Sequence, residues 1–214
     1  MSRRPARVSA DRILHAAALE FAARGFAGAR VDRIARRARV NKAMLYYHFA
    51  SKERLYRTLL RRMFGLAAAR LQAISASDAP AGEKVDRAIA GIAAFIEEHA
   101  FFPAIMLREV AEGGAHLDPE TLGALASVPR AVGTIVQQGI AHGDFRPVHP
   151  VFAYFSMLAP IMFYLAGSQI RKEIASLRLI DLRALSPDQF VRQLQESVRR
   201  SLARDVTPPS RPTR

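Results

Sequence analysis

Apolar residues recur at intervals of three and four along most of this chain, and this periodicity constrains the fold more than any other feature. The segment after residue 30 shows it clearly, with Val31, Ile34, Ala35 and Ala38. Such spacing places apolar side chains on one face of an α-helix. A convincing alternating apolar pattern bounded by hairpin turns does not occur. The sequence therefore predicts an all-α protein.

We expect about nine helices, and their ends are marked by capping residues. The first begins at Ser9, a good N-cap, and ends at Gly25. The others are predicted at about 31–38, 41–48, 51–74, 83–99, 103–112, 119–142, 151–170 and 187–203. The predicted domains are 1–52 for the first helices, with a flexible basic arm over 1–8, and 53–206 for the rest. Residues 207–214 are predicted to be a disordered tail.

Positive charge is concentrated in the first third of the chain. The formal net charge is +13. Residues 1–62 contain 16 Lys and Arg against four Asp and Glu, a charge of +12, and the other residues contain 16 against 15. A solvated basic face in an arginine-rich protein is one interpretation, and binding to acidic membrane surfaces is another. The near-neutral remainder favours a polyanion partner for the first third, namely nucleic acid.

Composition also excludes several classes of protein. The chain has no cysteine, which excludes disulfides, thiolate zinc sites and cysteine nucleophiles and fits a reducing cytoplasm. No signal-peptide pattern follows the basic N-terminus. Residues 151–170 carry no formal charge and reach the length of a spanning helix, but they contain Pro160 and Gly167 and stand alone. A helix buried in protein is the favoured interpretation, so we expect a cytoplasmic protein without a membrane partner.

Motifs of enzymes are absent. The sequence has no HExxH, P-loop, Gly-x-Ser-x-Gly or dinucleotide-binding pattern, so we expect no catalytic residue and no cofactor. Glu109, Glu112 and His116 have a spacing that could gather them on one side of a helix, as a metal site needs. Gly113 and Gly114 are expected to interrupt that helix, which favours a solvated acidic face without a metal.

Three short helices followed by a long one, within about fifty basic residues, suggest a helix-turn-helix. The major groove of DNA admits one helix, and a preceding helix must brace it. Residues 31–38 would brace and residues 41–48 would read the groove. Leu45 and Phe49 are predicted to anchor the reading helix in the core. The outward-facing residues would then be Lys42, Ala43, Met44, Tyr46, Tyr47 and His48.

At these residues the chain resembles a known family. Residues 31–55, VDRIARRARVNKAMLYYHFASKERL, resemble the DNA-binding signature of the tetracycline-repressor-like (TetR) regulators. Four segments are in register with the family signature: Ile34-Ala35, LYYHF, Ser51-Lys52-Glu53 and the upstream Phe21-x-x-x-Gly25-Phe26. The resemblance covers roughly residues 9–60 and extends to the helical remainder only by architecture.

The resemblance implies a sequence-specific transcriptional regulator, most simply a repressor that a small apolar ligand releases from a palindromic operator. It places Lys42, Ala43, Met44 and Tyr46 against base edges, with Lys42 donating to guanine and Ala43 or Met44 against a thymine methyl group. It places Tyr47, His48 and Lys52 against phosphates. Two residues depart from the family pattern. Arg30 stands where a threonine-like helix cap is usual, and Arg39 stands where a turn glycine is usual.

These two arginines add positive charge beside the predicted DNA face. We expect Arg30 to contact phosphate. Arg39 implies either a different turn or a left-handed residue, which costs about 1 kcal/mol without glycine.

The family resemblance also implies a homodimer formed through the helices near 151–170 and 187–203. The apolar character of these two helices agrees with a dimer, because such apolar surfaces need another protein surface to cover them. A small hydrophobic effector is expected between the middle helices, although ordinary core packing is the favoured interpretation for any single candidate residue. The candidate effector-binding residues are Phe95, His99, Phe102, Met106, Glu109, Phe155 and Phe163.

Overall fold

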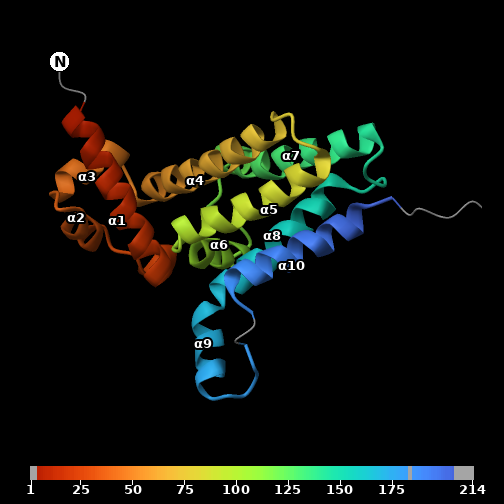
Figure 1. The fold of residues 1–214 in the computed structure, drawn as a ribbon. Coiled ribbons are helices and arrows are strands. Elements are labelled where there is room, and N and C mark those ends of the chain that lie inside the picture. Colours follow the sequence, from red (N-terminus) through yellow and green to blue (C-terminus); the bar gives the residue numbers. More distant parts are fainter. Residues whose placement is uncertain (1–3, 183–184, 205–214) are drawn as a thin grey trace, which may run out of the picture. The chain divides into compact units, whose positions relative to one another are not determined.

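The computed structural model of the chain describes residues 4–182 and 185–204. Helices make up almost all of this part, which confirms the all-α prediction (Figure 1). The ten helices within it are α1 (Arg4–Gly28), α2 (Val31–Ala38), α3 (Lys42–Phe49), α4 (Lys52–Ser75), α5 (Ala81–Glu98), α6 (Phe102–Ala111), α7 (Pro119–His142), α8 (Pro150–Ala166), α9 (Ser168–Ser176) and α10 (Pro187–Leu202).

Capping residues define several helix ends as the sequence predicts. The side chain of Asn41 accepts a hydrogen bond from the backbone N–H of Met44, at 2.7 Å, and so caps α3. Ser186 and Gln189 form a reciprocal capping box at the start of α10. Gly25 has φ +66° and breaks the helical geometry of α1 where the sequence predicts an end.

The N-terminal end of α1 differs from the prediction. The helix begins at Arg4 and not at Ser9, so the arm predicted over residues 1–8 is helical from Arg4 onward. Pro5 lies in the first turn, where its missing N–H is not needed and its fixed φ suits a helix. The predicted tail at 207–214 lies outside the described residues.

The apolar segment predicted as one helix over 151–170 is two helices. Gly167 separates α8 from α9 and raises the number of described helices to ten. Glycine weakens a helix through its backbone entropy, and a Cβ here would lie only 3.1 Å from the Phe163 carbonyl oxygen. Within residues 4–182 and 185–204, no single helix is long and apolar enough to cross a bilayer, and only the bent pairs α5–α6 and α8–α9 pass that test jointly.

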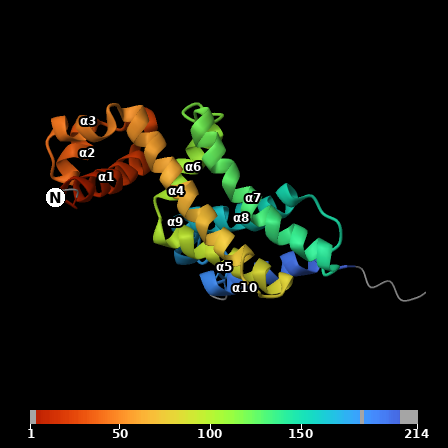
Figure 2. The same cartoon turned by 90° about the horizontal axis from the view of Figure 1, so that it is seen from above.

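The chain forms two compact units, and the first contains the residues up to Ala67 together with Phe95–Ser127. In this unit α1, α2 and α3 lie side by side in both views (Figures 1 and 2). Side chains from several helices fill its core with less than 2% exposure, among them Ile13, Phe21, Ile34, Leu45, Leu55, Leu60 and Phe64. The predicted reading helix is thus anchored in a well-packed core to which α1, α2, α3 and α4 all contribute.

The second unit contains Ala68–Ala94 and the residues from Val128 onward. Helices α8 and α10 lie side by side in it. The ring of Phe145 packs so closely on α7 that a Cβ at Gly139 would lie 2.2 Å from it. The buried ammonium of Lys84 donates to the Ser75 carbonyl at 2.8 Å and to Gln138 Oε1 at 3.0 Å. This lysine joins α4, α5 and α7 within the unit.

Candidate nucleic-acid interface

Helix α3 presents the outward face that the sequence predicts. Leu45 is fully buried and Phe49 is 8% exposed, so these two side chains fix the rotation of the helix. Tyr46 and Tyr47 are 42% and 81% exposed. Lys42, Ala43 and Met44 are exposed as well. Within the first unit, the side chains predicted to reach base edges therefore all point away from the core.

A buried carboxylate holds α2 against α1. Glu20 is 5% exposed, and its Oε1 accepts from Arg33 Nε at 2.5 Å and from the Arg30 N–H at 3.4 Å. Burial by itself raises the pKa of Glu20, but the hydrogen bonds from Arg33 and Arg30 outweigh it and hold the pKa below its ordinary value. The bracing helix is therefore fixed at its N-terminus by a charged contact.

Two turns with positive φ flank the reading helix. Arg39 ends α2 in the left-handed conformation, with φ 54° and ψ 45°. The chain therefore makes the left-handed turn although arginine stands where the family usually has glycine. The Arg12 guanidinium donates to the carbonyls of Ala38 and Arg39, at 2.5 and 3.3 Å, and satisfies this helix end. Ala50, after α3, has φ 59° and ψ −45°, and the Ser51 N–H donates to the Phe49 carbonyl at 2.6 Å. These values describe a γ-turn of the rare, strained kind.

Two exposed basic residues lie at helix N-termini, Lys42 at the start of α3 and Arg30 directly before α2. Lys42 Nζ is 3.0 Å from Asp32 Oδ1, and this hydrogen bond and charge raise the pKa of Lys42. Arg30 stands in extended conformation at the N-cap of α2, and its side chain makes no capping bond. Its exposed guanidinium lies at a helix N-terminus, as a phosphate-binding arginine would.

The structure gives Lys52 and His48 other surroundings than the predicted phosphate contacts. Lys52 Nζ donates to the carbonyls of Phe26 and Ala29, at 3.0 and 3.3 Å, and lies 4.5 Å from the centre of the Phe26 ring. Its ammonium would have to leave both carbonyls to reach DNA, because it joins α4 to the α1–α2 connection. His48 is half-buried, and its Nε2 is enclosed without a hydrogen-bond partner among the described residues.

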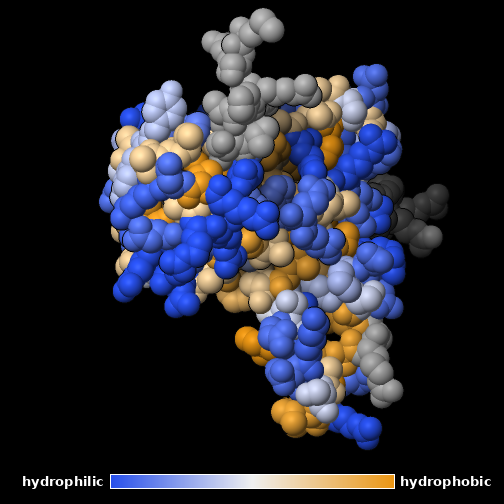
Figure 3. All heavy atoms as spheres, turned by 90° about the vertical axis from the view of Figure 1, so that its left-hand side faces the viewer, coloured by the Kyte–Doolittle hydropathy of each residue, from blue (hydrophilic) through white to orange (hydrophobic). Residues whose placement is uncertain are grey.

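A basic hollow between α1 and the end of α2 was not predicted as part of the site. Arg12, His15, Arg37 and Arg39 line it together with Asp11. The charge run from Arg36 to Arg39 is the sequence signal that points to it. Figure 3 faces the side of α1, α2 and α3 and shows hydrophilic residues gathered over it. Such a surface suits contact with a phosphate backbone.

The residues predicted to bind an effector fall in two environments. In the first unit, the Phe102 ring contacts those of Phe64 and Phe95 edge to face, with centroids 6.1 and 5.6 Å apart. The ring of His99 lies 4.5 Å from that of Phe95 at a tilt of 30°, and His99 Nδ1 is 2.8 Å from the Phe95 carbonyl oxygen. Met106 is half-buried and Glu109 is buried in the same unit, whereas Phe155 and Phe163 belong to the other unit and are exposed on α8.

Comparison with known proteins agrees with this geometry. The family described as "Bacterial regulatory proteins, tetR family" matches residues 13–59. The HTH-type transcriptional repressor NicS of Pseudomonas putida is 30% identical over 183 residues, which cover 80% of this chain and 81% of NicS. The HTH-type transcriptional regulator RutR of Escherichia coli is 27% identical over 203 residues, 92% of this chain and 89% of RutR.

Solved structures share the fold. The transcriptional regulator FadR from Bacillus subtilis, in complex with stearoyl-CoA, superposes with a TM-score of 0.71 at 19% identity, covering 90% of this chain and 98% of that one. The fold and the helix-turn-helix define a DNA-binding transcriptional regulator. The chain belongs to the TetR family, whose members act as regulators and not as enzymes.

Proposed function

We propose that this chain is a repressor that binds a palindromic operator as a homodimer and leaves it when a small apolar ligand binds. The outward face of α3, carrying Lys42, Met44 and Tyr46, is the observation that carries the proposal. Leu45 and Phe49 hold that face, so the side chains reach the groove from a rigid helix.

Base recognition would come from the first turns of α3. Lys42 would donate to guanine, Ala43 or Met44 would contact a thymine methyl group, and Tyr46 would lie against a neighbouring base edge. Because Asp32 pairs with Lys42 at 3.0 Å, the lysine must exchange one partner for another on binding. Tyr47 and Arg30, both exposed at the edges of this face, would contact phosphates, with His48 behind them.

A homodimer is supported by the outer face of α8. Val151, Phe152, Phe155 and Phe163 recur at helical spacing along this helix and are exposed by 43–72%. Aromatic side chains exposed in such a row mark an interaction surface. Helix α10, which lies beside α8, would complete the interface. A two-fold dimer would place two reading helices about 34 Å apart on the two halves of a palindrome.

The proposed effector is a small apolar ligand. The fold relative FadR was solved with stearoyl-CoA, a ligand with a long apolar acyl chain, and NicS is a repressor. These relatives support an apolar group on the ligand and repression here. Phe95, His99 and Phe102, with half-buried Met106, would offer an apolar lining with one polar group. Release requires that the ligand bind the DNA-incompetent form more tightly than the DNA-bound form.

Fluorescence anisotropy with the DNA upstream of the chain's own gene tests the proposal. We expect a preference of about a thousandfold or more for that duplex over a scrambled one of equal length at physiological salt. Lys42→Ala should reduce the preference about tenfold, because one base contact is lost. Lys172→Ala, an exposed lysine of α9, is the matched control and should have no effect. Equal binding of both duplexes would contradict sequence-specific recognition.

The dimer has its own test in analytical ultracentrifugation. Phe155→Glu places a charge on the outer face of α8 and should yield monomers. Val110→Glu, at a residue that is 73% exposed on α6, serves as the control and should leave the dimer intact. A dimer that survives Phe155→Glu would argue against this interface. The operator complex can then be challenged with ligands that carry an apolar chain, and stearoyl-CoA is the first to try.

A further inference from the structure

Three side chains with metal-binding groups converge where α6 ends. Glu109, Glu112 and His116 each offer one ligand atom, and these atoms all lie within 4.8 Å of one another. His116 Nδ1 is 2.8 Å from Glu109 Oε1 and 3.5 Å from Glu112 Oε2. The cluster shares no residue with the DNA-facing surface of α3, and it shares only Glu109 with the residues that the sequence predicts to bind an effector.

The glycine pair that was expected to separate these residues brings them together. Gly113 and Gly114 have φ values of 67° and 74°, which suit glycine, and they reverse the chain at the end of α6. The Gly114 N–H donates to the Glu109 carbonyl at 2.7 Å and closes the turn. His116 therefore returns to the side of α6 that carries both glutamates.

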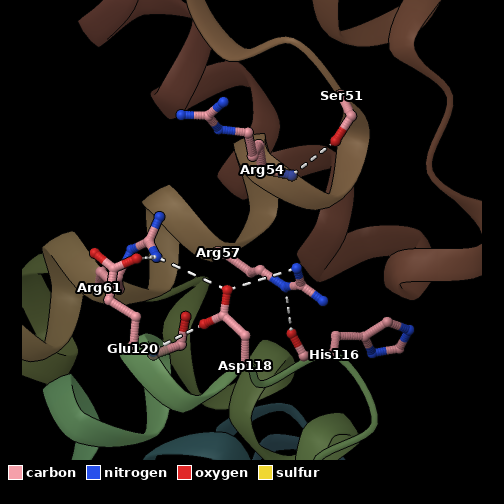
Figure 4. A network of polar contacts seen from close by, with 8 residues as sticks. Ser51, Arg54, Arg57, Arg61, His116, Asp118 and Glu120 are labelled. Carbon is pink, nitrogen blue, oxygen red and sulfur yellow. Dashed lines mark hydrogen bonds and ion pairs between the residues drawn. The ribbon is translucent and has the colours of Figure 1, made fainter.

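Ion pairs from α4 fix the loop that carries His116. Arg57 Nε donates to the His116 carbonyl at 3.0 Å, and the Arg57 guanidinium lies 3.5 Å from Asp118 (Figure 4). Arg61 pairs with Asp118 and Glu120 in the same network. The position of the imidazole thus does not depend on the glycine turn alone, and the site is held before any ligand binds.

One oxygen of the central carboxylate has no partner in the part of the chain that the structure describes. Glu109 is 2% exposed. Its Oε1 accepts from Tyr56 Oη and from His116 Nδ1, both at 2.8 Å, whereas its Oε2 is buried with no hydrogen-bond partner among the described residues. Leaving a buried carboxylate oxygen unpaired costs free energy, because it has lost its water. A cation bound between the three side chains would supply the missing partner.

The donor set defines the class of cation. One imidazole and two carboxylates suit a divalent transition ion such as Zn²⁺, and the chain has no cysteine to offer a softer alternative. Two ligands at ordinary Zn²⁺ bond lengths and tetrahedral angles lie about 3.3 Å apart. The 3.5 Å between His116 and Glu112 is close to that value. We propose that Glu109, Glu112 and His116 form a binding site for a divalent transition cation, a site that is independent of the DNA-binding and effector proposals.

The surroundings of the site predict what occupancy does. The ring of His116 lies 4.1 Å from that of Phe26 and 5.7 Å from that of Tyr56, which joins it to α1 and α4 within the first unit. A bound cation would fix the imidazole and both glutamates in this cluster. It would stabilise the first unit, because a ligand that binds only the folded state raises the unfolding temperature.

Zinc titration of the untagged full-length protein tests the site. Competition with a chromophoric chelator should give one Zn²⁺ per chain. Glu112→Gln and His116→Gln should each weaken binding at least about tenfold, since each removes one ligand. Glu97→Gln and His142→Gln, two exposed residues away from the cluster, are the matched controls and should bind Zn²⁺ as the wild type does.

Two further readouts separate a metal site from a hydrogen-bonded cluster. Co²⁺ should give visible absorption bands with the wild type that the Glu112→Gln variant lacks, and Zn²⁺ should raise the unfolding temperature of the wild type alone. Glu112 is about half exposed, so its variant is expected to fold even if His116→Gln does not. Zn²⁺ binding no tighter to the wild type than to Glu112→Gln would overturn the proposal.

Discussion

Replacing Ala50 by glycine should stabilise this protein, against the usual effect of glycine. Ala50 connects the reading helix to α4 with φ 59° and ψ −45°, a conformation in which a Cβ is crowded. Strain of this kind costs about 1–3 kcal/mol for a residue other than glycine. Glycine removes that cost but loses about 0.4–1 kcal/mol through greater freedom of the unfolded chain. The net expectation is a gain of about 1 kcal/mol.

Urea unfolding followed by circular dichroism measures the change in the free energy of unfolding. Ala76→Gly is the matched control, because Ala76 is also exposed and also follows a helix but has no positive φ. We expect this control to lose about 0.5–1 kcal/mol, so the two variants should move in opposite directions. Parallel scanning calorimetry should show an unfolding temperature about 2–4 °C higher for Ala50→Gly.

A loss of stability in Ala50→Gly equal to that in Ala76→Gly would refute the reasoning. It would mean that the turn after α3 is unstrained in solution. A gain would show that the chain keeps a strained residue directly after its reading helix. Operator affinity of the Ala50→Gly variant would then measure how far this turn fixes α3 for DNA binding.

Three further predictions concern the same unit. Asp32→Asn should raise operator affinity severalfold and steepen the salt dependence of that affinity, because Lys42 no longer has a charged partner at 3.0 Å. Fluorescence anisotropy at two salt concentrations measures both effects, and Asp78→Asn, at another exposed aspartate, is the control. The pKa of Glu20 lies below its ordinary value of 4.5, so its contribution to stability is complete above that pH and is lost as the pH falls through the lowered pKa. Urea midpoints between about pH 7 and about pH 3 should therefore fall more steeply for the wild type than for Glu20→Gln, and equal slopes would contradict this. Leu45→Ala removes a fully buried side chain and should lower the free energy of unfolding, measured by urea unfolding, by about 2–5 kcal/mol. A loss below about 1 kcal/mol would show that Leu45 does not anchor α3 in the core.

Local signals in the sequence determined most of the helices and the outward face of α3. The Asn41 cap, the box at Ser186 and the spacing of Leu45 and Phe49 each act within about one helical turn. The groups that interact are therefore close in sequence, so the local sequence pattern is enough to predict each interaction. At Arg39 the family resemblance left two alternatives open, a different turn or a left-handed residue, and the structure shows the left-handed residue.

Only the tertiary structure decided the contacts between residues far apart in the chain. Lys52 binds carbonyls 23 and 26 residues away, a contact that the sequence did not predict. Tyr56 meets Glu109 across 53 residues, and the Gly113–Gly114 turn carries His116 back to the same carboxylate. Periodicity and capping reach only a few residues, so they predict which helix forms and which face is apolar. Which side chains meet depends on how helices pack, and that follows from shape and burial across the whole unit.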